Sequence, residues 1–196
     1  DGWYDNYFNA YDVLLKKTLD TGNGYSGTGI ISAKALHEEG NELAQQAKIE
    51  LVPTSKARPL ESTMLRRGLA LKASAPVYIN GRLAGVLYGA KLLNRNYAIP
   101  DNIKDLIFNK QKIDGVEYGT VTIFLDNIRV STNVTLKNGE RAIGTCVSEE
   151  VYRKVVVQKK IWLDKAFVVN NWYISAYKPI FNVADKVVGI LYVGIL

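Results

Sequence analysis

The sequence predicts an α+β fold in which an antiparallel sheet is flanked by helices. Alternating apolar residues mark five strands in the C-terminal half, turn residues join neighbouring strands into hairpins, and other segments show helical periodicity. The chain has 196 residues, of which 47% are hydrophobic and 22% charged. This composition is ordinary for a globular protein, and the length accommodates one large domain or two small ones.

Helical patterns occur in four segments. A long N-terminal helix is predicted over residues 3–19, where apolar side chains recur at helical spacing. A second helix is predicted over residues 32–48, with Ser32 as its N-cap. A third begins near Pro100, a residue suited to a first helical turn, and a fourth covers residues 148–158.

Seven segments have strand patterns. They are residues 69–79, 82–92, 120–125, 128–134, 165–169, 172–181 and 186–196. The Asn80-Gly81 pair between the first two is the strongest two-residue hairpin signal. The glycine-rich stretch 22–29 is predicted to be a flexible loop.

One hairpin pattern occurs twice. A proline-bounded strand, a turn and a Gly-aliphatic-Leu-Tyr strand occupy residues 75–89 and again residues 178–194. The matching glycines, Gly85 and Gly189, are 104 positions apart. This domain-sized spacing favours two tandem copies of one α/β module. The alternative is a chance similarity between two amphipathic hairpins, since strands use few residue types.

Composition narrows the function classes. The net charge is +6, but the basic residues are scattered and cluster only in pairs, so nucleic-acid binding is not expected. Cys146 and His37 are the only cysteine and histidine, which leaves no disulfide and no cluster for a metal, and no cofactor is expected. We expect Cys146 to be a small buried residue and His37 a solvated one. A hydrolase using these two residues is the enzymatic alternative, and we expect no enzyme.

Membrane segments are not evident in the sequence itself. It contains no run of 18 or more apolar residues. Residues 187–196 nevertheless form an apolar run without a polar tail, which indicates a domain belonging to a longer protein.

Candidate binding residues lie on the predicted strands. Arg129 and Ser131 share one face of residues 128–134 by the period of two, and a cation with a hydroxyl donor can hold a carboxylate. A half-exposed strand with its polar side in water is the alternative. Phe124 on the preceding strand is included as a candidate contact.

The penultimate strand contributes two tyrosines to one face, Tyr173 and Tyr177. Tyrosine combines apolar area with a polar tip, which suits a small-ligand pocket and equally suits cross-strand packing. Trp162 and Phe167 flank Lys165 and are candidates for the pocket wall, with plain core packing as the alternative.

Several runs in the second half resemble the Cache domains of bacterial and archaeal receptors. They are Gly119-Thr-Val-Thr-Ile-Phe124, Arg129-Val-Ser-Thr-Asn-Val134, Arg141-Ala-Ile-Gly-Thr145, Ala166-Phe-Val-Val-Asn-Asn-Trp-Tyr173 and Gly189-Ile-Leu-Tyr-Val-Gly194. Residues 68–78 and 85–97 are similar to the preceding portion of tandem or fused Cache sensors, whereas residues 1–63 match only loosely.

The resemblance implies a PAS-like five-stranded sheet flanked by helices, held outside the cytoplasmic membrane between two transmembrane helices. It implies a membrane-distal, Cache-like module with N-terminal helices in residues 1–98, with fewer strands than a complete module, and a membrane-proximal Cache module in residues 99–196. The parent would be a histidine kinase or a chemoreceptor. Such sensors bind small molecules, often short carboxylates or amino acids, in a pocket beneath a helix-and-loop cover. They are often dimers, although no residue pattern here fixes an interface.

The expected ligand contacts are Phe124, Arg129, Ser131, Trp162, Lys165, Phe167, Tyr173 and Tyr177. One departure concerns Lys165, because similar sequences tend to carry arginine there, and lysine lacks the planar fork that grips a carboxylate with two hydrogen bonds. The alternative function is a PAS-like or profilin-like module that binds a protein partner through an exposed sheet edge.

Overall fold

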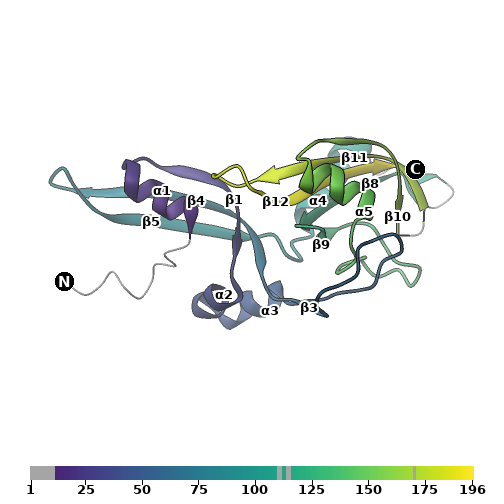
Figure 1. Ribbon diagram of the computed structural model, residues 1–196, viewed down its shortest axis with the longest axis horizontal. Coiled ribbons are helices and arrows are strands. Elements are labelled where there is room, and N and C mark those ends of the chain that lie inside the picture. Colours follow the sequence, from purple (N-terminus) through teal and green to yellow (C-terminus); the bar gives the residue numbers. More distant parts are fainter. Residues whose placement is uncertain (1–11, 110–111, 114–115, 170) are drawn as a thin grey trace.

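The computed structural model describes residues 12–109, 112–113, 116–169 and 171–196. It has two main parts, a five-stranded sheet with its helices and a long two-stranded arm that projects away from this sheet (Figure 1). The helices are α1 Val13–Thr21, α2 Ala33–Glu39, α3 Asn41–Ala47, α4 Ala98–Phe108, α5 Glu149–Tyr152 and the π-helical continuation η1 Arg153–Val157. The strands are β1 Tyr25–Ile31, β2 Ile49–Glu50, β3 Met64–Leu65, β4 Gly68–Ile79, β5 Arg82–Leu92, β6 Lys112–Ile113, β7 Val116–Glu117, β8 Gly119–Leu125, β9 Ile128–Thr132, β10 Trp162–Val168, β11 Asn171–Phe181 and β12 Val187–Ile195.

The five-stranded sheet has the order β10-β11-β12-β8-β9, and every neighbouring pair is antiparallel. Each of its strands overlaps a segment predicted from the sequence, so this prediction is confirmed. Chain connections are hairpins except between β9 and β10, where α5 and η1 cross one face. That face carries a core built around Phe124, Tyr177 and Tyr192, against which Val151 and Val155 pack.

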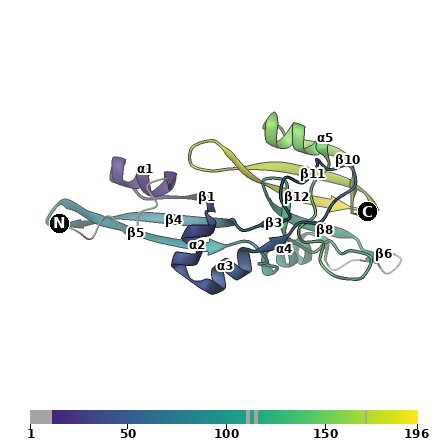
Figure 2. The same ribbon diagram turned by 60° about the horizontal axis from the view of Figure 1, so that its bottom comes forward.

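The arm is the hairpin β4–β5, extended by β1 into a three-stranded sheet of order β1-β4-β5. Its turn is the predicted Asn80-Gly81 pair, and both residues have positive φ, of 50° and 75°. Such angles match the type of tight turn whose twist suits a hairpin. Helix α1 lies along one side of the arm (Figure 2).

The base of the arm and the five-stranded sheet share a second core. Leu69 and Leu93 from the arm pack there with Ile123, Leu125 and Val130 from the sheet. Asn94 lies between the two parts and is fully buried. Its side-chain oxygen accepts a hydrogen bond from the backbone N–H of Leu69 at 2.9 Å, and its side-chain nitrogen donates to the carbonyls of Ala47 and Arg67. The division of the chain into two modules at residue 98 stays a prediction, because a core shared by both parts does not show where one module ends.

Two predicted elements differ from the structure. Residues 22–29, expected to be a loop, include most of β1, which pairs with β4 from Tyr25 to Ile31. The helix expected over residues 32–48 is two helices, α2 and α3, separated at Gly40, whose φ of 156° no helix accommodates. The described part of the N-terminal helix is α1, and residues 3–11 of that prediction lie outside the described residues.

Candidate functional site

The site is set by a β-bulge in β9. Phe124 of β8 is opposite Arg129, but the next position, Ile123, is opposite Ser131, so Val130 is an extra residue. A bulge reverses the alternation of side chains. Arg129 therefore lies with Phe124 at the first core, whereas Ser131 lies with Ile123 at the second. The prediction that Arg129 and Ser131 share one face is wrong for this reason, and the Ser131 hydroxyl instead donates to the carbonyl of Asn96 at 2.7 Å.

The Arg129 side chain is buried, with 2% of its surface exposed. Its guanidinium lies over the Phe124 ring, 5.0 Å from the ring centroid, and Nη1 donates to the hydroxyl of Thr145. Its backbone is held as well, since the N–H of Arg129 donates to the Thr145 carbonyl and the N–H of Gly144 donates to the Arg129 carbonyl. Both the position and the direction of this cation are therefore fixed.

Arg129 has no acidic partner within the described part of the chain: no carboxylate forms an ion pair with it, and its Nε–H has no hydrogen-bond acceptor. Burial lowers the pKa of the guanidinium, and the groups that oppose this shift are tyrosines and Cys146. Arginine nevertheless stays charged in proteins. A buried charge without a counter-charge is costly, so this position is primed for an anion.

Tyrosines form one wall beside Arg129. Tyr173 and Tyr177 are buried on the same face of β11, as the alternation predicts. Tyr177 packs on Tyr192 with ring centroids 4.6 Å apart, and on Phe124 at 6.3 Å. Burial raises the pKa of the Tyr177 hydroxyl and raises that of Tyr192 to about 12. Both hydroxyls are therefore protonated at neutral pH and can donate hydrogen bonds.

A segment from far upstream covers the site. Residues 52–58, which we call the strap, run between β2 and β3. The N–H of Cys146 donates to the Thr54 hydroxyl at 2.9 Å, and the N–H of Glu149 donates to the Lys56 carbonyl at 2.8 Å. The Lys56 ammonium also lies over the ring of Trp172, 4.8 Å from its centroid.

Glycine at position 144 lets the strap approach. Gly144 has a φ of 82°, and a Cβ there would come within 2.1 Å of the Glu50 carbonyl oxygen. Its own carbonyl accepts the N–H of Val52 at 3.0 Å, at the start of the strap. A side chain at this position would push the strap away from the sheet.

Between the strap and the sheet is a cavity of about 20 Å³. Its polar lining comes from Arg129 and Tyr177, from the strap residues Thr54 and Ser55, and from Ser148 at the start of α5. Phe167 and Cys146 are among its apolar neighbours. A volume of this size holds about one water molecule. A larger ligand therefore requires the strap to move.

The remaining predicted contacts lie elsewhere. Lys165 is opposite Ile174 on the exposed face of β10 and β11, so the structure separates it from Arg129, and the expectation that it joins the same site is wrong. Trp162 belongs to the core, and its indole N–H has no acceptor among the described residues. The structure thus brings together Phe124, Arg129 and Tyr177, with Tyr173 nearby. Phe167 borders the cavity, but its ring packs on Trp172, with ring centroids 5.6 Å apart.

The exposed face of the sheet has a wider, open hollow of about 540 Å³. Its lining is mainly apolar, from Trp172, Ile174 and Leu196, with Lys165 as the one cation among the described lining residues. Unlike the cavity at Arg129, it contains no buried charge. We therefore place the candidate site at Arg129.

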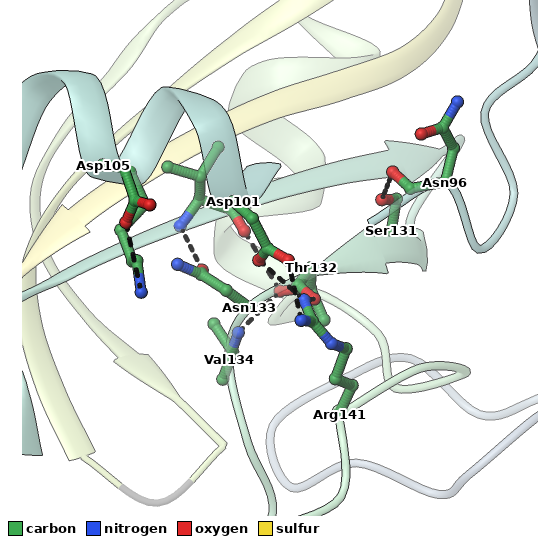
Figure 3. A network of polar contacts seen from close by, with 10 residues as sticks. Asn96, Asp101, Asp105, Ser131, Thr132, Asn133, Val134 and Arg141 are labelled. Carbon is green, nitrogen blue, oxygen red and sulfur yellow. Dashed lines mark hydrogen bonds and ion pairs between the residues drawn. The ribbon is translucent and has the colours of Figure 1, made fainter. Parts of the chain in front are cut away.

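An ion pair next to the site has a structural role. Arg141 makes two hydrogen bonds of 2.8 Å to the carboxylate of Asp101 on α4, and donates to the Thr132 carbonyl at 2.7 Å (Figure 3). The hydrogen bonds to Asp101 raise the pKa of the Arg141 guanidinium. Because Arg141 is already paired with the Asp101 carboxylate, it is not a candidate for ligand binding, and it joins α4 to the end of β9.

Sequence reasoning missed the residues of the strap and of the segment after β9. Thr54 and Ser55 lie about 75 positions before Arg129 and show no periodic pattern. Thr145 and Ser148 lie in a segment without a regular strand, and the sequence analysis predicted only that a helix begins at residue 148. Residue types in loops carry little information on which distant strand they contact.

The comparisons agree with this architecture. The second half of the chain has a five-stranded antiparallel sheet with a covered polar site on one face. Residues 91–196 match the family model described as single Cache domain 3, and the chain belongs to this family. Domains of this family are generally extracytoplasmic sensors of signalling receptors. A search of curated proteins gave no match. In the described part of the chain, no helix is long and apolar enough to cross a membrane.

Proposed function

We propose that this domain senses a small anionic metabolite, such as a short carboxylate or an amino acid, which binds at Arg129. The observation that carries the proposal is the buried guanidinium without a counter-charge among the described residues. A ligand carboxylate would supply the missing charge and accept the free Nε–H. Tyr177 and Ser148 add hydroxyls at the same cavity.

The strap supports a mechanism of signalling. A ligand at Arg129 would also contact Thr54 or Ser55, because both line the cavity. The strap leads through β3 into the arm, so ligand contacts with both sides would favour one position of the arm relative to the sheet. Such a ligand shifts a pre-existing equilibrium by the difference in its affinity for the two states.

The proposal extends to the parent protein. We propose a histidine kinase or chemoreceptor in which this domain is held outside the membrane between transmembrane helices. The three-stranded sheet of the arm would be an incomplete second Cache-like module, as the recurring hairpin pattern suggests. The domain would act by binding and not by catalysis. Burial raises the pKa of the Cys146 thiol to about 11, which disfavours a thiolate nucleophile at neutral pH.

A protein-interaction module is the second candidate. It is favoured by exposed apolar side chains at the β10 edge of the sheet, where Leu163 is 73% and Trp172 57% exposed. A partner strand could pair with β10, which has one neighbour in the sheet.

Calorimetry with small carboxylates and amino acids tests the proposal, after a thermal-shift screen of the purified domain. A ligand at 100 times its dissociation constant adds about 2.7 kcal/mol to the free energy of unfolding. The variant Arg129→Met should bind none of the compounds that the wild type binds, because it keeps the length of the side chain and removes its charge.

Lys165→Met is the matched control, since it removes a lysine from the opposite face and should retain binding. Equal affinity of wild type and Arg129→Met would refute the site. A domain that binds none of these compounds but captures a strand peptide at β10 would support the second candidate.

A further inference from the structure

The two faces of the arm differ. On one face, Ser74 and Lys72 of β4 are buried and contact α1 and its N-cap residue. The Ser74 and Thr18 hydroxyls are 2.6 Å apart, and the Lys72 ammonium binds the Asp12 carboxylate that caps α1 at 2.5 Å. The part of this face around Lys72 and Ser74 is therefore covered within the chain.

The opposite face, which we call the outer arm face, is apolar and exposed. It consists of Leu71, Ala73, Ala75, Val77, Gly85, Leu87 and Gly89, which follow from the β4–β5 register. Leu87 is 69% exposed, Leu71 46% and Val77 43%. None of these seven residues is polar or charged, and β1 adds Ser26 and Thr28 along one edge of the face. A continuous apolar face of this kind marks an interaction surface.

The shape of the outer arm face is self-complementary. Large and small residues alternate, because Leu87 pairs with Ala75 while the neighbouring pair is Ala73 and Gly89. A Cβ added at Gly85 or Gly89 would meet no atom within 4 Å, so these positions are open hollows. When a surface with both ridges and hollows is turned onto a second copy, the ridges of each can enter the hollows of the other.

We propose that two copies of this chain pack through their outer arm faces about a two-fold axis, as two sheets stacked face to face. Stacked sheets are about 10 Å apart and bury the side chains between them. Leu87 would lie near the centre of this interface. The inference does not depend on a ligand at Arg129.

The area is sufficient for a reversible dimer. The β4–β5 ladder has ten paired positions, which at about 3.3 Å each gives a length of about 33 Å. Two strands at about 4.8 Å give a width of about 10 Å, and β1 adds a third strand only from Ala70 to Ser74, so the projected area is about 400 Å² per copy. Two copies would bury about 800 Å² before side-chain relief is added, which is below the area of stable complexes and corresponds to a weak, reversible dimer.

A second copy fits better than a charged partner. The chain has a net charge of +6, yet the charged residues of this face are confined to its two ends, Lys91 at the base and Arg82 at the tip. Their long side chains can reach solvent beyond the contact. The uncharged centre offers an ionic partner nothing to pair with, while it allows two positively charged copies to meet.

Sedimentation velocity tests the proposal over a concentration series from about 1 µM to about 1 mM. The wild type should shift from monomer to dimer. Leu87→Lys should weaken the association by roughly 100-fold or more, because it buries an unpaired charge in the interface. Leu163→Lys is the matched control, a similarly exposed strand leucine given the same charge, and should associate like the wild type.

A label identifies the surface directly. In a Cys146→Ala background, a spin label at Ala75→Cys should show dipolar coupling between copies, and a label at Leu163→Cys should not. Thermal melting verifies that each variant is folded. A wild type that stays monomeric throughout, including one that instead binds lipid vesicles through the arm, overturns the proposal. Equal association of the two lysine variants does so as well.

Discussion

The arm and the five-stranded sheet each bury one cation, and they treat it differently. Lys72 in the arm has 5% of its side chain exposed and is paired with Asp12, whose carboxylate also caps α1. Arg129 in the sheet is as deeply buried but has no described carboxylate beside it. Lys72 therefore joins two elements of one chain, whereas Arg129 is left with unused hydrogen-bonding capacity.

This difference separates a structural charge from a candidate binding charge. Removing a charge from water costs several kcal/mol, and an ion pair with good geometry offsets the cost. Evolution can retain an unpaired buried cation only where another partner supplies the offset or where function requires it. The two cations should consequently respond in opposite ways when their surroundings are changed.

The largest effect is expected in the arm. Asp12→Asn leaves Lys72 buried without its counter-charge and should lower the free energy of unfolding by about 3–5 kcal/mol. Urea denaturation measures the change. Asp20→Asn is the control, because it removes an exposed partner of Lys16 and should cost less than about 1 kcal/mol. Equal effects of the two variants would show that Lys72 and Asp12 are not energetically coupled.

Alkaline pH should weaken the sheet before the arm. Burial raises the pKa of the Cys146 thiol to about 11 and that of the Tyr88 hydroxyl in the arm to about 12. Because each folded pKa lies above the unfolded one, each contribution is complete below the unfolded pKa and is lost as pH rises through the folded one.

Ionisation of Cys146 should therefore lower the free energy of unfolding of the wild type by about 2 kcal/mol between about pH 9 and pH 11. Cys146→Ala has no such group and should lose correspondingly less stability over this range. Urea denaturation at a series of pH values compares the two. Parallel curves for wild type and variant would contradict the assignment to Cys146.

A smaller effect of opposite sign is expected at Arg129. Without ligand, Arg129→Met removes an unpaired buried charge and should raise the free energy of unfolding by about 1 kcal/mol. Arg141→Met is the contrasting variant, because Arg141 is paired with Asp101 and its loss should destabilise. A large loss of stability in Arg129→Met would mean that its contacts with Thr145 and Phe124 are structural.

Much of the fold followed from local patterns. The Asn80-Gly81 turn and the alternation of Tyr173 and Tyr177 were predicted because each depends on a few neighbouring residues. The strand β1 was missed because Gly27 and Gly29 have low strand propensity, and pairing with β4 overrides it.

The candidate site was less predictable. Nothing in the sequence marks the extra residue Val130, and without it the period of two places Ser131 beside Arg129. Lys165 was misplaced because β10 has apolar residues on both faces, so its pattern does not indicate the buried side. The strap depends on tertiary contacts, such as that between Thr54 and Cys146, which have no local signature.

The smallest effect concerns the strap. Thr54→Ala removes the acceptor for the Cys146 N–H and should weaken strap closure by about 1 kcal/mol, which corresponds to roughly a fivefold faster alkylation of the buried Cys146 thiol. Thr21→Ala at the end of α1 is the control, since its exposed hydroxyl is far along the chain from the site. A ligand bound at Arg129 should slow alkylation in the wild type by holding the strap closed. If Thr54→Ala and wild type react at the same rate, access to Cys146 does not pass through the strap.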